Sequence, residues 1–410
     1  MNNFKLNAEY AASFGAYWMI YAIAGSFASV FMLAKGYDNV HIGMTLAAAN
    51  LLALALQPYV ADHMDRAKGI RLIDAAAWMT LIMMIAAVGL FIFGDGSFML
   101  AAILAFVLAV HALAQPLLNS LGFRLSESGA NVSFGIGRAG GSLGYSAILA
   151  VLGTIVERKG VMTLPALTEA ACALLIVLLL ITKGSFIRIC RTADAKAAEG
   201  AEAEAKAADD ERIDLGDFIR RNKHFFIMNF GVAGLLFSNA VLSNYMAQIA
   251  GGVNGTTEDV GRILSLMALL EIPTMVFFGS IRKRFSSRAL IKLAALGFTG
   301  KIALCWLAGS VRLLYVAQFF QLIAFALIMP AMVYFINEIM SPGEAVKGQA
   351  LYTMMFTFST IIASFLGGWM LDAYGARMLT LVSTLVTAAG AAVVIFSIDK
   401  VEDHKRLPQD

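Results

Sequence analysis

A carboxylate lies deep inside an apolar stretch of the chain, at Glu271 of "SLMALLEIPTMVFFGSIRKRF". It lies 12 residues from the start and 9 residues from the end of the predicted helix at 259–280, or roughly 18 Å and 14 Å at the helical rise. A charge at the centre of a membrane span costs ~2.5–3.5 kcal/mol, and a glutamate side chain cannot reach the interface from that depth. Because burial favours the neutral form of a carboxyl group, Glu271 could bind and release a proton. The alternative is a permanent ion pair that locks two helices.

Two basic residues also stand in apolar surroundings. Lys301 falls midway along the next predicted span and is the first candidate partner of Glu271, unless its long stem reaches toward the interface. Arg138 lies about one turn into another span, where its guanidinium could bind hydroxyl pairs or carboxylates or simply remain a cytoplasmic charge. Tyr145 follows on the same helical face, and an aromatic ring can stack on the apolar face of a sugar or a base. These residues favour a binding site for a small solute.

Further polar side chains of the predicted spans could line the same cavity: Tyr17, Tyr21, Asn119, Asn239, Asn244, Tyr245, Gln318 and Gln321. Each is equally explained by an interhelical hydrogen bond, worth ~0.6 kcal/mol on average. His111 could titrate near neutral pH or stay neutral and buried. The sequence shows no nucleophile beside a base, no phosphate loop and no metal-binding spacing. It predicts a protein that is not an enzyme and has no cofactor, with protons as the coupling ion.

The composition indicates the class of protein in which these residues lie. Hydrophobic residues make up 59% of the 410 positions and charged residues only 14%, which is typical of an integral membrane protein. The net charge of +3 is too small to suggest a nucleic-acid partner. Runs near the ~20 residues that cross a bilayer predict an all-α membrane protein with twelve transmembrane helices. The predicted spans are 10–34, 41–61, 70–93, 97–120, 134–156, 162–183, 223–250, 259–280, 288–309, 312–337, 346–371 and 376–398.

A polar tract divides these spans into six and six. We predict an N-terminal six-helix bundle at 1–183, a cytoplasmic central linker at 184–222, a C-terminal six-helix bundle at 223–400 and a cytoplasmic tail at 401–410. The linker contains "ADAKAAEGAEAEAKAADDER", which has no apolar face and is typical of a surface helix or a loose linker. Two such bundles suggest pseudo-symmetric repeats with a solute site near the midplane.

The basic residues of the loops predict the orientation. They gather in the central linker, in the loop after the second span and in the loop after the eighth span, whereas "GDGS" and "GGVNGTTE" on the opposite side carry little charge. Basic loops face the cytoplasm, so both termini are expected there, in a bacterial inner membrane.

These features resemble the major facilitator superfamily. Its loop signature, a small residue followed by an acid and basic residues, reads Ala61, Asp65, Arg66 and Arg71 here. The copy in the second half keeps Gly279 and basic residues but has no acid. The resemblance implies the major facilitator fold, and Asp65 and Arg66 are then expected in a cytoplasmic gate.

The lactose-permease-like branch, which includes oligosaccharide, nucleoside and aromatic-acid proton symporters, is similar over nearly the whole chain. "FGAYWMIYAIAGSFASVFMLAKGYD" resembles its first span, "SFGIGRAGGSLGYS" its fifth, and "VGRILSLMALLEIP" its eighth with the acid in place. This likeness implies that Arg138 and Tyr145 bind the solute and that Glu271, with Lys301, couples protons.

Three positions depart from that branch. Its sugar-binding glutamate of span 4 is Asn119 here, and the histidine and glutamate of span 10 are Gln321 and Ala324. The expected function is proton-coupled symport of a small hydroxylated solute, a sugar or glycoside first, by a monomer in the lipid bilayer. Open alternatives are a nucleoside or aromatic-acid symporter and an uncoupled facilitator or exporter. A receptor or scaffold would have no need of the buried charges.

Overall fold

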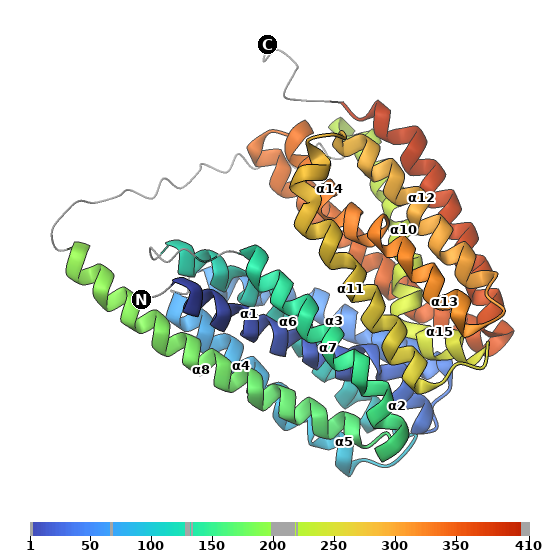
Figure 1. Ribbon diagram of the computed structural model, residues 1–410, viewed down its shortest axis with the longest axis horizontal. Coiled ribbons are helices and arrows are strands. Elements are labelled where there is room, and N and C mark those ends of the chain that lie inside the picture. Colours follow the sequence, from blue (N-terminus) through green and yellow to red (C-terminus); the bar gives the residue numbers. More distant parts are fainter. Residues whose placement is uncertain are drawn as a thin grey trace. The chain divides into compact units, whose positions relative to one another are not determined.

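The protein is helical throughout the part that the structure describes. The computed structural model describes residues 3–65, 69–127, 132, 134–197, 218 and 220–402. Every regular element in these ranges is a helix (Figure 1). Because lipid offers no partner for backbone N–H and C=O groups, a helix that satisfies its own backbone is the expected way to cross it. The all-α prediction is confirmed.

The helices form two compact units. The first comprises Met1–Ala205 together with Thr257–Ala268, and the second comprises Lys206–Thr256 together with Leu269–Asp410. Helix α11 (Thr257–Arg282) therefore contributes its first half to the first unit, where Ser265 Oγ donates to the carbonyl oxygen of Ser146 at 2.8 Å. The predicted bounds of the two bundles stay a prediction.

In the first unit, the first span consists of three consecutive elements, and the other helices follow in the order of the sequence. They are α1 (Asn3–Ile20), the π-helical turn η1 (Tyr21–Ser26), α2 (Ala28–Ala34), α3 (Asn39–Asp65), α4 (Gly69–Ala87), α5 (Gly89–Ile92), α6 (Phe98–Glu127), α7 (Phe134–Lys159) and α8 (Thr163–Ala197). Helix α1 packs against α7 and α8, and α4 packs between α6 and α8. Helix α8 continues past the predicted end of its span at residue 183 as far as Ala197. The rest of the linker up to residue 217 lies outside the described residues.

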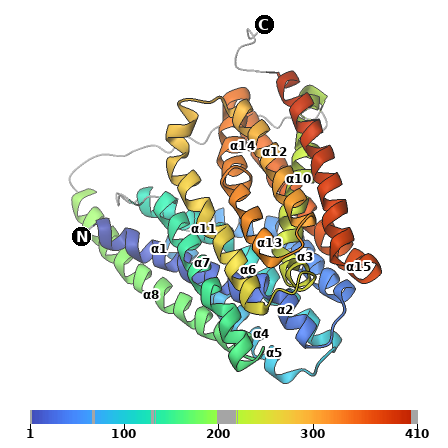
Figure 2. The ribbon, with the colours of Figure 1, turned by 45° about the vertical axis from the view of Figure 1, so that its right-hand side comes forward.

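The second unit is built around α10 and α15. Its elements are α10 (Lys223–Gly251), the rest of α11, α12 (Ser287–Trp306), α13 (Val311–Gln318), η2 (Phe319–Leu322), α14 (Phe325–Ile339), α15 (Pro342–Ser397) and η3 (Ile398–Lys400). Helix α15 packs against α10 and α12, and Figure 2 shows these helices together.

The long helix α15 represents two spans. Its 56 residues would extend about 84 Å at the helical rise, far more than a bilayer needs. Gly375, with φ 79° and ψ 175°, interrupts it, and glycine adopts this positive φ without the clash that a Cβ would cause. The two stretches coincide with the predicted spans 346–371 and 376–398. Within the described chain, the other predicted spans each match one of ten further membrane-length segments.

Small residues let α1 and α7 approach closely. A Cβ added at Gly144 would lie 2.6 Å from the Cα and the carbonyl oxygen of Gly15, and one added at Gly140 would strike the backbone of Ala11. Backbone contact of this kind lets membrane helices gain van der Waals packing. The glycines of α7 thus admit the backbone of α1.

Replacing Gly144 by alanine is expected to destabilise the protein by about 1–3 kcal/mol, because the added methyl group forces the two backbones apart. Gly184→Ala in α8 is the matched control, since no atom lies within 4 Å of its added Cβ. The control should be slightly stabilising, as alanine is the better helix former. Thermal unfolding of the two purified variants checks this, and equal melting temperatures would contradict it.

Candidate functional site

Three polar side chains of the second unit form a connected chain in its interior. Lys301 of α12 donates from Nζ to Oε1 of Gln321 at 2.5 Å, and Gln321 donates from Nε2 to Oε1 of Glu271 at 2.8 Å. Lys301 is 1% exposed and Gln321 is fully buried, while Glu271 is half-buried. We call these residues the Lys–Gln–Glu chain. It links an ammonium group to a carboxylate through a single amide.

A break in span 10 positions Gln321. Helix α13 ends at Gln318, η2 continues as a 3-10 turn, and Ala324, with φ −93° and ψ −101°, stands before α14. A 3-10 stretch inside a helix often marks a hinge. Thr274 of α11 donates its hydroxyl to the carbonyl oxygen of Leu322 at 2.8 Å. This bond satisfies a backbone group that the break releases, as the apolar surroundings require.

The sequence predicted two parts of this arrangement and missed their connection. Glu271 and Lys301 were predicted as partners, and Gln321 was assigned separately to the solute. The structure places Gln321 between the two charged residues. The break that turns its amide toward both of them follows from tertiary contacts, such as Phe320 packing over Gly300 of α12. One feature of the sequence could have indicated this connection: Gln321 stands at the position where the lactose-permease-like branch has the histidine of span 10.

In the first unit, aromatic side chains of the first and fourth spans stack on one another. The rings of Tyr17 and His111 lie 4.0 Å apart at 15°, and the rings of His111 and Tyr21 lie 5.5 Å apart at 28°. Tyr17 donates its hydroxyl to the carbonyl oxygen of His111 at 2.9 Å, and Nε2 of His111 lies 3.0 Å from the carbonyl oxygen of Tyr17. The two residues thus hold each other in place between α1 and α6.

The stack continues to α7. The rings of Tyr21 and Tyr145 lie 6.4 Å apart at 23°, and the hydroxyl of Tyr145 lies 2.7 Å from that of Ser26. We call the four rings of Tyr17, His111, Tyr21 and Tyr145 the aromatic column. It brings together three of the predicted solute-binding residues.

The other predicted site residues are distributed over several helices. Asn119 of α6 and Asn239 of α10 are half-buried, and the side-chain oxygen of each lacks a hydrogen-bond partner among the described residues. Arg138 is half-buried near the start of α7. Asp65 is the last residue of α3, and Arg66 lies outside the described residues. The predicted gate of Asp65 and Arg66 therefore falls largely outside the described residues and stays a prediction.

Span 7 is kinked at Tyr245, which the sequence predicted, with Asn244, either to line the cavity or to form an interhelical hydrogen bond. Tyr245 has φ −124° and ψ 21° inside α10 and donates its hydroxyl to the carbonyl oxygen of Ser364. Asn244 donates from Nδ2 to Oγ of Ser364 at 3.0 Å. Both side chains are thus used in packing α10 against α15.

The fold and these contacts can be compared with known proteins. The sequence profile described as the MFS_1 like family matches residues 11–382. The chain belongs to the MFS_1-like family. It is therefore a multi-pass membrane transporter of the major facilitator type rather than an enzyme, as the sequence predicted.

Individual relatives of this MFS_1-like protein are more distant. A "Putative sugar efflux transporter" of Deinococcus radiodurans is 25% identical over 145 residues, which are 35% of this chain and 37% of that protein. The chain thus aligns with little more than a third of that relative's length. The solved structure of the nucleoside transporter NupG has a TM-score of 0.72 and 16% identity, covering 97% of this chain and 99% of that one. A bacterial homologue of the human lysosomal transporter Spinster, inward-facing and unoccupied, gives 0.66 and 14%, covering 97% of each chain. At these identities the two structures show a shared fold.

Sequence reasoning missed one acid of this MFS_1-like protein in the second unit. The basic loop after α11 has no acid of its own, but Glu338 of α14 lies beside it. Ser287 donates its hydroxyl to Oε1 of Glu338 at 2.9 Å, and the Arg282 guanidinium lies 3.9 Å from that same oxygen. Arg282 also stands 4.2 Å from the ring centre of Tyr334. A residue distant in sequence thus supplies the carboxylate that the loop motif lacks.

A second missed acid is Glu9 of α1, which is 9% exposed. Its Oε1 accepts a hydrogen bond from Ser185 of α8 at 3.1 Å, and Lys5 lies 3.9 Å away. Its other oxygen has no hydrogen-bond partner among the described residues. Because Glu9 precedes the predicted start of the first span, its burial could not be expected from the sequence.

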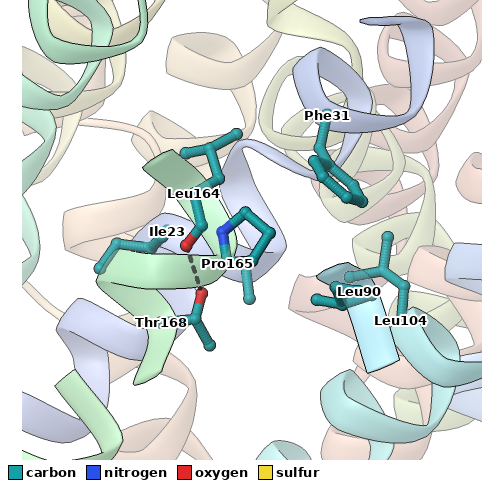
Figure 3. Close-up of a pocket in the computed structure, with 8 residues that line it drawn as sticks. Ile23, Phe31, Leu90, Leu104, Leu164, Pro165 and Thr168 are labelled. Atoms are coloured by element: carbon teal, nitrogen blue, oxygen red, sulfur yellow. Dashed lines mark hydrogen bonds between the residues drawn. The ribbon is translucent and has the colours of Figure 1, made fainter. Parts of the chain in front are cut away.

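The pocket shown in Figure 3 belongs to the first unit and is apolar. It is lined by Ile23, Ala24, Phe31, Leu90, Leu104, Leu164, Pro165 and Thr168. The one hydroxyl among them, on Thr168, donates to the carbonyl oxygen of Leu164 at 2.9 Å. Without a charged or free polar group, this pocket is a poor site for a hydroxylated solute. Among the described residues, no cluster of three His, Cys, Asp or Glu side chains could hold a metal ion.

Proposed function

We propose that this transporter couples the movement of a small hydroxylated solute to protons, with Glu271 as the residue that binds the proton. The Lys–Gln–Glu chain is the observation that carries the proposal. A carboxylate held in the interior of a helical unit is costly, and its connection to Lys301 through Gln321 offers it compensation. Because that compensation depends on one amide in a broken helix, a modest movement can remove it.

The coupling step follows from the charges in the chain. While Gln321 donates to Glu271, the ionised carboxylate is stabilised by a charge-assisted hydrogen bond. When span 10 bends at its hinge and this contact is lost, burial favours the neutral carboxyl group and a proton binds. Proton binding removes a negative charge from the second unit. The change in charge can then favour the alternate conformation of the transporter.

A sugar or glycoside is the first candidate solute. The name of the Deinococcus radiodurans relative supports a sugar, and the likeness to NupG supports a nucleoside as the next choice. Within the chain, the candidate binding residues are Arg138, Tyr145, Asn119, Tyr17, Tyr21, Asn239 and Gln321. The buried, unpartnered oxygens of Asn119 and Asn239 suit hydroxyl donors of such a solute.

Uncoupled transport or export is the second candidate function. Two observations favour it, namely Ala324 where the lactose-permease-like branch has a span 10 acid, and the efflux activity in the relative's name. Adding solute to a weakly buffered suspension of cells that express the protein separates the cases. Alkalinisation of the medium supports symport, no pH change means uncoupled movement, and acidification means exchange of solute for protons.

We propose that the transporter lies in the inner membrane of the cell with both termini in the cytoplasm. Cysteines introduced at Lys283 and Gly251 test this orientation, after the native cysteines have been replaced. Lys283 is exposed in the basic loop, and Gly251 is exposed with no atom within 4 Å of an added Cβ. A membrane-impermeant maleimide applied to intact spheroplasts should label the cysteine at 251 and leave that at 283 unlabelled. The reverse pattern would contradict the orientation.

A further inference from the structure

Glu9 of α1 is a buried carboxylate that the proposed transport mechanism does not use. Its side chain meets α8, which packs beside α1 (Figure 1). Ser185 of α8 donates its hydroxyl to Oε1 of Glu9 at 3.1 Å, whereas Oε2 is buried and has no hydrogen-bond partner among the described residues. A buried charge without compensation is costly. The unsatisfied oxygen can therefore accept a ligand from outside the protein.

The cations around Glu9 neutralise little of its charge. Lys5, one turn earlier in α1, lies 3.9 Å from Oε1, but its side chain is 60% exposed. Exposed ion pairs contribute little. In α8, Lys183 lies 2.6 Å from Asp74 of α4 and so compensates another carboxylate, and Arg188 is exposed. The negative charge of Glu9 thus remains largely available to a bound cation.

Two hydroxyls one helical turn away present lone pairs rather than hydrogens to each other. Ser13 donates to the carbonyl oxygen of Glu9 at 2.9 Å, and Thr182 donates to that of Leu178 at 2.9 Å. A hydroxyl has one hydrogen and two lone pairs, so neither group has a hydrogen left for the other. Their oxygens lie 3.5 Å apart, and both residues are fully buried. Two oxygens that face each other in this way repel unless a cation lies beside both.

The spacing of these two oxygens suits a small cation. Calcium, which has nearly the radius of Na⁺, binds oxygens at about 2.3–2.6 Å, so two ligands at a right angle stand about 3.3–3.7 Å apart. Divalent cations are usually held by several carboxylates, and the single one here favours a monovalent ion. A proton on Glu9 would remove its charge but leave the facing hydroxyl oxygens as they are. A metal cation compensates both.

We propose that this carboxylate and the hydroxyls around it bind a small monovalent cation such as Na⁺ between α1 and α8. The ligands are Glu9, Ser13, Thr182 and Ser185. Glu9 faces Ser185, and one turn further along the antiparallel helices Ser13 faces Thr182. Residues one turn apart have Cβ atoms ~5–6 Å from each other, close to the ~5 Å between oxygens on opposite sides of such an ion. The site lies in the first unit and is additional to the proposed proton site at Glu271 of the second unit.

Thermal unfolding of the purified full-length protein, in NaCl and in choline chloride of equal ionic strength, tests the inference. A ligand that binds only the folded protein raises the melting temperature as its concentration increases. We expect the melting temperature to rise with NaCl and not with choline chloride. Equilibrium dialysis with labelled Na⁺ should give a single bound ion per chain. Equal melting temperatures in the two salts, with no Na⁺ bound, would overturn the inference.

Variants assign the ion to these residues. Glu9→Gln keeps the shape of the side chain without its charge and should abolish the rise with NaCl. Thr182→Val removes one oxygen ligand and should raise the Na⁺ concentration that is needed by about tenfold or more, as the loss of a group that supports a metal site does. The matched controls are Glu258→Gln in α11 and Thr168→Val in α8, where Thr168 donates to Leu164. Both should respond to Na⁺ as the unaltered protein does.

The measured quantity is the response to Na⁺, so a variant that is merely less stable still gives an answer. If Glu9→Gln does not fold, Ser13→Ala and Thr182→Val decide. A full response to Na⁺ in all the folded variants would overturn the site. The result is independent of proton coupling, because unfolding and dialysis involve neither a solute nor a pH gradient.

Discussion

Replacing Glu271 by glutamine is expected to abolish concentrative uptake while solute exchange across the membrane continues. Glutamine resembles the protonated carboxyl group in shape and charge, so the variant can adopt the solute-loaded conformations. It cannot release a proton, so a pH gradient can no longer drive accumulation. The accumulation ratio, inside over outside, should fall from its gradient-dependent value to about one. Each tenfold lost in this ratio corresponds to ~1.4 kcal/mol of stored free energy. Uptake of labelled solute into proteoliposomes with an imposed pH gradient measures this.

Glu258→Gln is the matched control for this experiment. It makes the same change in the first turn of the same helix, where Glu258 pairs with Arg262 one turn away. Surface pairs of this kind contribute ~0.3–0.5 kcal/mol, so concentrative uptake should persist. Accumulation by Glu271→Gln in proportion to the gradient would assign proton binding to another residue. Glu271 would then be the permanent ion-pair partner that the sequence left open.

The spans could be predicted because each depends on a local property, the length of an apolar run. Most predicted ends lie within a few residues of the observed spans, as for 41–61 against Asn39–Val60, but α1 begins at Asn3 rather than at residue 10. The same property predicted two spans within α15, because its apolar residues are enough for two runs, at 346–371 and 376–398. Helix α8 extends beyond the predicted end of its span at residue 183 as far as Ala197. The residues of this extension need not be apolar, so the length of an apolar run does not predict it. Its helicity comes from residues such as alanine and lysine that favour a helix anywhere.

The candidate site was predictable only as a set of residue types at membrane depth. Depth identified Glu271 and Lys301, because charge inside a span always needs an explanation. The connection through Gln321 depends on a hinge that no local pattern in span 10 announces.

The two missed acids illustrate the same limit. Glu338 became relevant only when α14 was seen to bring it to Ser287 and Arg282. The motif in the first half keeps its acid in the loop, whereas the second half recruits one from another helix. The contact of Glu338 with the basic loop therefore depends on the packing of α14, which no spacing within the loop predicts.

Removing the cation of the Lys–Gln–Glu chain should have a large effect on stability as well as on transport. Lys301→Met keeps the side-chain volume but leaves Glu271 and the amide of Gln321 without the ammonium group. Breaking a buried pair by removing one partner costs about 3–5 kcal/mol. Lys292→Met is the matched control, the same substitution in the same helix, where Lys292 pairs with Asp399 at 2.6 Å near the surface. That pair should contribute at most about 1 kcal/mol.

The double variant Lys301→Met with Glu271→Gln decides whether the chain connects the two charges. Because glutamine carries no charge that needs compensation, the double variant should recover most of the stability lost in Lys301→Met, though not concentrative uptake. Thermal unfolding of the four purified proteins gives the coupling free energy between the two positions. Losses that simply add would mean that Gln321 transmits nothing between Lys301 and Glu271. Recovery of stability without recovery of accumulation would instead show that Lys301 stabilises the ionised carboxylate of Glu271. The same carboxylate gains and loses the proton in the proposed cycle. Stability and coupling would then depend on the same two hydrogen bonds.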